Sequence, residues 1–331
     1  MKKCGICIFG GLVLALCCSF PAYAQELIVG GQAVGIQLTT DGVLVAGLSE
    51  VETDAGPCAP AREAGVCEGD LVTAVDGAPV SDATSLMDAV AGAGEGPVSL
   101  TLTRGERELT LSVTPAESSE GRPMLGILLR DALSGIGTLT FCDPDTGCFG
   151  ALGHSISEGG SGLVLPVQDG SVTDAQIVSV RPGAPGDPGE LNGVSDLGAE
   201  LGRIERNTEA GVFGSLTRLL EGERMEIGRI TAGPASILST VEGRERREYA
   251  VEVNRVYRDA GGTHAMLSVT DGELLQRTGG IVQGMSGSPI LQNGRLVGAV
   301  THVFVSNPAR GYAVSIQDML RAAGYAAEPA A

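Results

Sequence analysis

Glycine and proline interrupt this chain at short intervals and so limit the length of any regular element. The 331 residues include 50 glycines and 16 prolines, separated by short runs rich in Val, Leu, Ile and Thr. Such runs, bounded by turn residues, are typical of strands joined by turns. Few stretches keep a helical period. The sequence therefore predicts a mostly β protein, and its length allows two domains.

The chain carries a large excess of acidic residues, 40 Asp and Glu against 22 Lys and Arg. This balance repels phosphate backbones and leaves no release of counterions to drive their binding. It excludes nucleic acid as a partner, and otherwise indicates solubility.

The first 24 residues have the pattern of an export signal. Lys2 and Lys3 precede an apolar stretch over residues 6–20, and Ala22-Tyr-Ala24 matches an A-x-A cleavage site. We expect export across the cytoplasmic membrane and a mature chain that begins near Gln25. The apolar stretch is almost long enough to span a bilayer, so an uncleaved membrane anchor is the alternative.

Four cysteines follow that segment: Cys58, Cys67, Cys142 and Cys148. An even number outside the cytosol indicates disulfides, and the pairs Cys58 with Cys67 and Cys142 with Cys148 would each close a short loop. Zinc is the rival interpretation, but neither pair has C-x-x-C spacing. We expect no metal and no cofactor.

Residues 35–113 alternate strand and helix signals. A hairpin is expected around Thr40-Asp-Gly42, then a helical turn near residue 61 and a strand that ends at Asp76-Gly77. Ser81 can cap a helix that runs to Val90, and a pair of strands follows over 98–103 and 109–113.

The run "AGVCEGDLVTAVDGAPV" within this region resembles the bacterial PDZ domain. The resemblance implies an α+β domain over residues 30–115 that binds a partner's chain end as an added strand. Its groove would be formed by Gly35, Ile36, Gln37 and Leu38 with the helix over 81–90. The alternative is that these segments are only a core strand and helix.

A polar, proline-bounded stretch then marks a domain boundary. Residues 116–123 lack periodicity and are expected to be a linker. A second domain is expected over 124–325, followed by a disordered tail over 326–331.

The best candidate for a catalytic segment is Gly284-Met-Ser-Gly-Ser-Pro289. It comes just before two apolar strands joined by Asn293-Gly294. A nucleophilic serine needs an exposed hydroxyl and nearby N–H groups for an oxyanion, and flanking glycines permit that turn. The segment is similar to the G-x-S-G-[GS]-P turn of trypsin-like peptidases. That similarity implies Ser286 as nucleophile, with the amides of Gly284 and Ser286 as oxyanion hole. A plain glycine-rich turn with a buried serine is the alternative.

A serine needs a base, and the chain has three histidines: His154, His264 and His302. His154 ends a short strand at a glycine turn and is the preferred base. The other two lie in or beside apolar strand runs, although His302 is only sixteen residues after Ser286.

The third member of a triad would be a carboxylate. Asp271 is the best candidate, but the sequence pattern barely separates it from Asp196 and Asp259.

Three segments together resemble the sporulation stage IV protein B (SpoIVB) peptidases: "FGALGHSI", "NTEAGVFGSL" and "TGGIVQGMSGSPILQNGRLVGAVTHVFVSNPARGY". The resemblance implies a trypsin-like double β-barrel behind the PDZ domain, with a triad of His154, Asp271 and Ser286. Ser155 stands where that family usually has glycine.

The resemblance also implies a role. A secreted serine endopeptidase would cleave its own chain and a membrane-associated regulator in the intermembrane space of the developing forespore, so that an intramembrane protease is activated and a sigma factor is processed. Its partners would be protein or peptide substrates. The alternatives are a non-catalytic PDZ adaptor and a general extracytoplasmic quality-control protease.

Overall fold

The computed structural model describes residues 26–94, 96–105, 107–157, 164–218 and 220–325. The expected signal segment and the expected tail over 326–331 lie outside these residues. Within the described ranges, no helix is long and apolar enough to cross a membrane.

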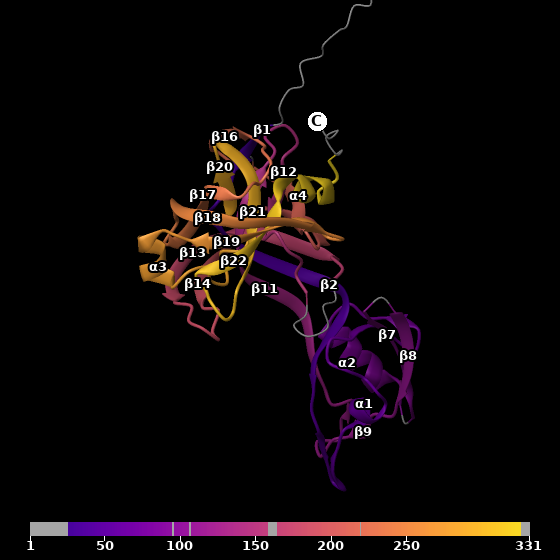
Figure 1. Cartoon of the computed structure of the whole chain (residues 1–331). Coiled ribbons are helices and arrows are strands. Elements are labelled where there is room, and N and C mark those ends of the chain that lie inside the picture. Colours follow the sequence, from indigo (N-terminus) through magenta and orange to yellow (C-terminus); the bar gives the residue numbers. More distant parts are fainter. Residues whose placement is uncertain (1–25, 95, 106, 158–163, 219, 326–331) are drawn as a thin grey trace, which may run out of the picture.

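The N-terminal α+β domain occupies the lower part of Figure 1. Its elements are β3 (Val51–Thr53), β4 (Gly56–Cys58), α1 (Pro60–Glu63), β5 (Leu71–Val75), β6 (Ala78–Pro79), α2 (Ala83–Gly92), β7 (Val98–Arg104), β8 (Arg107–Val113), β9 (Ala116–Glu117) and β10 (Pro123–Met124). Helix α2 begins after Asp82, whose side chain accepts a hydrogen bond from Ser85 N, so Asp82 and not Ser81 is the N-cap. Leu86 and Val90 are buried on one face of this helix.

A first barrel follows, made of strands that pair in a closed circle. Its strands are β2 (Ala33–Leu48), β11 (Ile127–Cys142), β12 (Cys148–Ala151), β15 (Gly211–Leu216), β14 (Glu190–Thr208) and β13 (Asp169–Arg181). The circle closes because β2 pairs with β11 on one side and with β13 on the other. The short strands β1 (Glu26–Val29) and β16 (Arg224–Glu226) extend the sheet beyond β11.

The second barrel is closed by β17 (Gly233–Glu242), β18 (Glu245–Asp259), β19 (Gly262–Val269), β22 (Arg310–Ser315), β21 (Arg295–Val303) and β20 (Pro289–Gln292). Helices α3 (Gly272–Thr278) and α4 (Ile316–Ala322) follow β19 and β22. Alternate residues of β18 show why this segment is a strand, since Tyr249, Val251 and Val253 are buried while Glu248 and Ala250 are exposed. The expected fold class, an α+β domain followed by a double β-barrel, is confirmed.

Two long strands run from one domain into the other (Figure 1). β11 pairs with β2 from Ile127–Leu48 at the N-terminal domain to Thr138–Ala33 in the first barrel. The expected linker over 116–123 includes the paired strands β9 and β10. The connection between the domains is therefore a two-stranded ribbon rather than a single flexible segment.

This ribbon overturns one prediction from the sequence. Gly35, Ile36, Gln37 and Leu38 lie in the first barrel, hydrogen-bonded to β11 on one side and to β13 on the other. A strand paired on both edges has no backbone groups left for a peptide. These four residues therefore do not form the peptide groove of the N-terminal domain.

The four cysteines are free thiols in this structure, so the predicted disulfide pairs are not formed. Cys142 is opposite Phe149 in the β11–β12 ladder. Since neighbouring residues of a strand point to opposite faces, the side chain of Cys148 points away from that of Cys142. The Cys58 and Cys67 thiols contact different carbonyls, those of Val51 and Gly65.

Candidate active site

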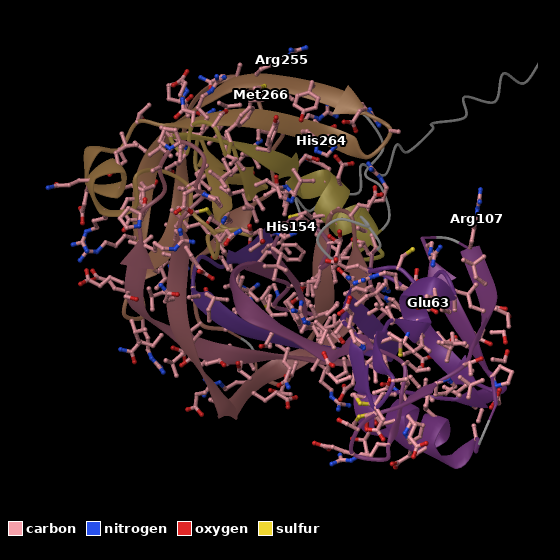
Figure 2. The ribbon with its side chains drawn as sticks, turned by 90° about the horizontal axis from the view of Figure 1, so that it is seen from below. Glu63, Arg107, His154, Arg255, His264 and Met266 are labelled. Atoms are coloured by element: carbon pink, nitrogen blue, oxygen red, sulfur yellow. The ribbon has the colours of Figure 1, made fainter. Side chains whose placement is uncertain are left out.

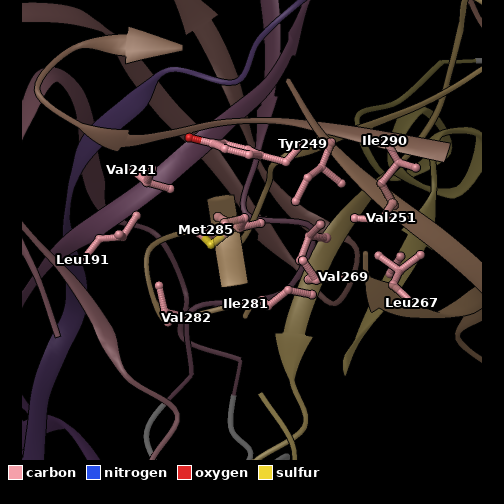
Figure 3. Packing of buried hydrophobic residues seen from close by; sticks show 14 of the residues in the cluster. Leu191, Val241, Tyr249, Val251, Leu267, Val269, Ile281, Val282, Met285 and Ile290 are labelled. Carbon is pink, nitrogen blue, oxygen red and sulfur yellow. The ribbon is translucent and has the colours of Figure 1, made fainter. Parts of the chain in front are cut away.

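Ser286 lies in a tight turn between α3 and β20. Gly284 and Gly287 on either side have φ values of +96° and +94°, which favour glycine. Met285 is fully buried in the core of the second barrel, where Figure 3 shows it among Leu191, Val241 and Tyr249. The buried Met285 fixes the turn and leaves the neighbouring Ser286 half-buried at its surface.

The oxyanion hole predicted from the sequence uses the backbone N–H groups of Gly284 and Ser286. Across the described part of the chain, neither group donates a hydrogen bond to another residue, whereas the Met285 and Gly287 amides bond to Val282 O and Val300 O. The two amides are thus free to bind an anionic oxygen, and their role stays a prediction.

Strand β11 of the first barrel holds this turn in place. Thr138 N donates to Ser286 O at 2.9 Å, and Thr138 Oγ1 donates to Gly284 O at 2.9 Å. Thr140 Oγ1 donates to Gly287 O at 2.8 Å. The carbonyls of the serine turn are therefore tied to the opposite barrel.

His154, labelled in Figure 2, lies in a turn that follows β12. Leu152 and Gly153 have φ values of +67° and +70°, and a Cβ at Gly153 would lie 3.2 Å from Val300 O and from Thr301 Cγ2. Asn207 fastens the segment after the histidine, because its side chain bonds to both Ile156 N and Ile156 O. His154 is half-buried between the barrels.

The imidazole of His154 has a defined hydrogen-bond partner. Its Nδ1 lies 2.8 Å from Ser155 O. A carbonyl oxygen only accepts, so Nδ1 carries the proton and Nε2 keeps a free lone pair. That is the tautomer a general base requires.

The pKa of His154 is lowered to about 4, first by burial and then by the neighbouring charge of His302, while the bond to Ser155 O acts in the opposite direction. The base is therefore neutral at neutral pH.

One cleft contains both residues. It has a volume of about 420 Å³ and is lined by Ser286 and His154 together with apolar side chains of both barrels. Among these apolar residues are Ile136, Leu152 and Val303. None of the described residues that line it is Asp, Glu, Lys or Arg. A cleft without charges in so acidic a protein favours apolar groups of a ligand.

The hydroxyl of Ser286 bonds to a backbone carbonyl and not to His154. Ser286 Oγ donates to Thr301 O at 2.6 Å, and in the described part of the molecule no hydrogen bond joins Ser286 to His154. The hydroxyl must rotate away from this carbonyl before it can give its proton to Nε2. Such bonds are often absent without substrate and form in the complex.

Asp271, assigned to the triad by resemblance, is the N-cap of α3. Its carboxylate accepts from Leu274 N at 2.9 Å and from Ala250 N at 3.4 Å. It does not line the cleft that contains His154 and Ser286. Asp259, one of the carboxylates that sequence left open, bonds to His264 Nε2 at 3.1 Å.

The other two histidines lie in different surroundings. His264 in β19 stacks on Tyr257, with ring centroids 5.6 Å apart, and lies among strands of the second barrel (Figure 2). His302 in β21 lines the cleft with Ser286 and His154. The sequence left His302 as a minor candidate for the base, and its contact with the cleft could not be seen from an apolar strand run.

Sequence reasoning also missed Thr138, Asn207 and Thr301. Asn207 lies in the "NTEAGVFGSL" segment, but only the fold brings it to Ile156. Thr138 and Thr301 have no local signal, since each acts across more than ten residues of sequence.

The chain matches two family models. That of the SpoIVB peptidase S55 matches residues 121–320, and that of a PDZ domain matches residues 53–104. No curated protein matches the chain.

Similar solved structures include forms of the Rv3671c protease from M. tuberculosis. Its active form is 13% identical, with a TM-score of 0.33, and the match covers 61% of this chain and 78% of that one. The inactive form of a serine-to-alanine mutant is 12% identical, with a TM-score of 0.34, and covers 57% and 82%. The assignment of this chain rests on the family models.

Proposed function

The chain belongs to the SpoIVB peptidase S55 family and is a serine peptidase, and we propose that it is an endopeptidase in which Ser286 is the nucleophile and His154 the general base. The observation that carries this assignment is the cleft that both side chains line, with two free backbone amides at the serine turn. Thr138 of β11 holds the serine turn, and Asn207 of β14 holds the segment that follows His154.

The mechanism follows from these groups. His154 Nε2 takes the proton of Ser286 Oγ as this oxygen bonds to the carbonyl carbon of the substrate. The amides of Gly284 and Ser286 bind the resulting oxyanion. The tetrahedral intermediate then expels the amine, which takes its proton from the imidazolium. In the second half of the reaction, His154 takes a proton from water as the water attacks the acyl carbon, and it returns this proton to Ser286 Oγ as the acid product leaves.

The triad role that resemblance gives to Asp271 stays a prediction. It requires the carboxylate to exchange its bonds with Leu274 N and Ala250 N for one with the imidazole of His154. In this structure Ser155 O occupies the Nδ1 side of that ring.

We place the peptide-binding groove of the PDZ domain along α2 and the start of β11. Helix α2 packs against β10 and β11. Within the described residues, Ile127, Leu128 and Leu129 pair only with β2, so the opposite edge of β11 is free to accept a strand. Because β11 continues to Thr138, a peptide at this edge would lie on the strand that holds the serine turn.

The proposed biological role is regulatory proteolysis in sporulation signalling. Family membership and the N-terminal export pattern support it. The substrates would be the protein's own chain and a membrane-associated regulator, in the intermembrane space of the developing forespore. Cleavage of that regulator would activate an intramembrane protease and lead to sigma-factor processing.

Fluorophosphonate labelling of the protein that begins at Gln25 tests the catalytic assignment. The wild type should be labelled, and both Ser286→Ala and His154→Ala should lose labelling. His264→Ala is the matched control and should be labelled like the wild type, since His264 does not line the cleft. Undiminished labelling of Ser286→Ala would refute the assignment, and failure of the wild type to label would favour a non-catalytic PDZ adaptor.

A further inference from the structure

His302 lies against the proposed base. The ring centroids of His154 and His302 are 4.5 Å apart, with an angle of 32° between the planes. The first ring belongs to the turn after β12 and the second to β21, so the contact joins the two barrels. Both rings line the cleft that contains Ser286.

The backbone before His302 is fixed to the serine turn. Gly287 N donates to Val300 O at 2.8 Å, and Val300 N donates to Ser288 O at 2.9 Å. Ser286 Oγ donates to the carbonyl of Thr301, the residue next to His302. A side chain on this strand therefore has a nearly constant position relative to the nucleophile.

In the part of the chain that the structure describes, no carboxylate bonds to the His154 ring. Among the described residues, the hydrogen bond of the His154 ring goes to Ser155 O, and Asp271 caps α3. Glu209 is the acidic residue that lines the smaller hollow beside the two histidines, together with Ser155, Ile156 and Ser157. No hydrogen bond or ion pair joins Glu209 to either ring in this part of the structure.

We propose that His302 is a positioning residue of this peptidase, which holds the His154 imidazole in place for Ser286 by ring packing while Ser155 O fixes its tautomer. The inference rests on the proposed function. An imidazole that makes one hydrogen bond to its own neighbour is free to swing about that bond. The ring of His302 packs against this imidazole and so restricts its rotation. His302 belongs to the second barrel, which also carries the nucleophile.

The packing role has a definite chemical signature. A planar ring at position 302 should preserve the contact even without nitrogen atoms, whereas a small side chain should not. Burial is the main cause of the lowered pKa of His154, and repulsion by a protonated His302 adds to it. Glu209 is the acidic residue that lines the hollow beside the pair, so replacement of His302 by an uncharged ring should raise the pKa of His154 somewhat.

Steady-state kinetics of purified variants on one peptide substrate give the first test. His302→Ala should lower kcat by about 100-fold with little change in KM, the loss expected from a base displaced by about 1 Å. His302→Phe should recover most of that loss, and its kcat should begin to fall at a higher pH than that of the wild type. His264→Ala should match the wild type.

Asp271→Asn keeps an N-cap side chain and removes the carboxylate. If His302 and not a carboxylate positions the base, its kcat should fall by less than that of His302→Ala. A triad acid would instead lose about 10⁴-fold on this change. Full activity of His302→Ala, or His302→Phe as inactive as His302→Ala, would overturn the proposal.

A second readout does not depend on turnover. In the Ser286→Ala background, nitrogen NMR of the His154 ring should show one tautomer, with the proton on Nδ1, in the parent and in His302→Phe. His302→Ala should keep this tautomer but show broadened ring signals, because the ring then swings about its bond to Ser155 O. An unchanged ring signal in His302→Ala would refute the positioning role even if the protein proved to be no peptidase, so the two failures are distinguishable.

Discussion

Gly287 lies so close to the backbone of Leu152 that a side chain at residue 287 would not fit between them. A Cβ at Gly287 would lie 2.5 Å from Leu152 N and 2.0 Å from Thr138 O. The turn that carries the proposed nucleophile and the turn that carries the proposed base thus meet through backbone atoms alone. Their separation depends on the absence of a side chain at residue 287.

Gly287→Ala should therefore abolish most activity, because its methyl group would push the serine turn away from His154. We expect a loss in kcat/KM of at least about 100-fold. The matched control is Gly294→Ala in the β20–β21 turn, where φ is +71° and no atom lies within 4 Å of the added carbon. The control should lose about 1 kcal/mol of stability and keep its activity. Equal activities of the two variants would contradict this account of the site.

The pH dependence of cleavage should reflect the buried base. The folded pKa of His154 is about 4, against an ordinary 6.5, so the base should stay neutral and kcat/KM should hold as the pH falls below 6.5. The pH profile of kcat/KM measures this, and an acid limb near the ordinary histidine pKa would contradict it.

The same shift affects stability. Between pH 6.5 and 4 the unfolded chain binds a proton at His154 that the folded chain does not. The free energy of unfolding should therefore fall as the pH falls through that window. Urea denaturation at both ends of the window should show a smaller difference for His154→Ala than for the wild type.

The cleft has no Asp, Glu, Lys or Arg among its described lining residues. It should therefore favour substrates with an apolar residue at the bond that is cleaved. Peptides with Leu or Phe there should be cleaved faster than those with Lys or Glu. Val303→Asp introduces a carboxylate in the wall of the cleft and should raise the ratio of Lys to Leu cleavage. Val194→Asp is the control, since Val194 is 62% exposed and does not line this cleft. Preference of the wild type for Lys or Glu would refute this prediction.

The PDZ groove makes a separate prediction. Met87 on α2 and Met124 on β10 are 56% and 47% exposed, on two elements that pack together. Met87→Glu should weaken the binding of peptides with apolar C-termini, measured by fluorescence anisotropy. Val178→Glu, on an exposed face of the first barrel, should bind as the wild type does. Weaker binding on substitution of Gln37 instead would restore the groove first predicted from the sequence.

Local chemistry explains which expectations from the sequence are confirmed. Asn293 and Gly294 both adopt positive φ in the turn between β20 and β21, as the dipeptide predicts for a hairpin. Leu86 and Val90 face the core of the N-terminal domain because a helical period places them on one side. The glycines around Ser286 mark a special turn, and their positive φ values require glycine there.

The sequence by itself therefore determined the strands, their turns and the residues able to do chemistry, because these depend on neighbours a few positions away. Only the tertiary structure decided which of them meet. It paired residues 35–38 with a strand on each edge, placed Asp271 at a helix end and set His302 against His154. These outcomes depend on pairing between residues far apart in the chain, which no local pattern of charge, glycine or hydrophobicity specifies.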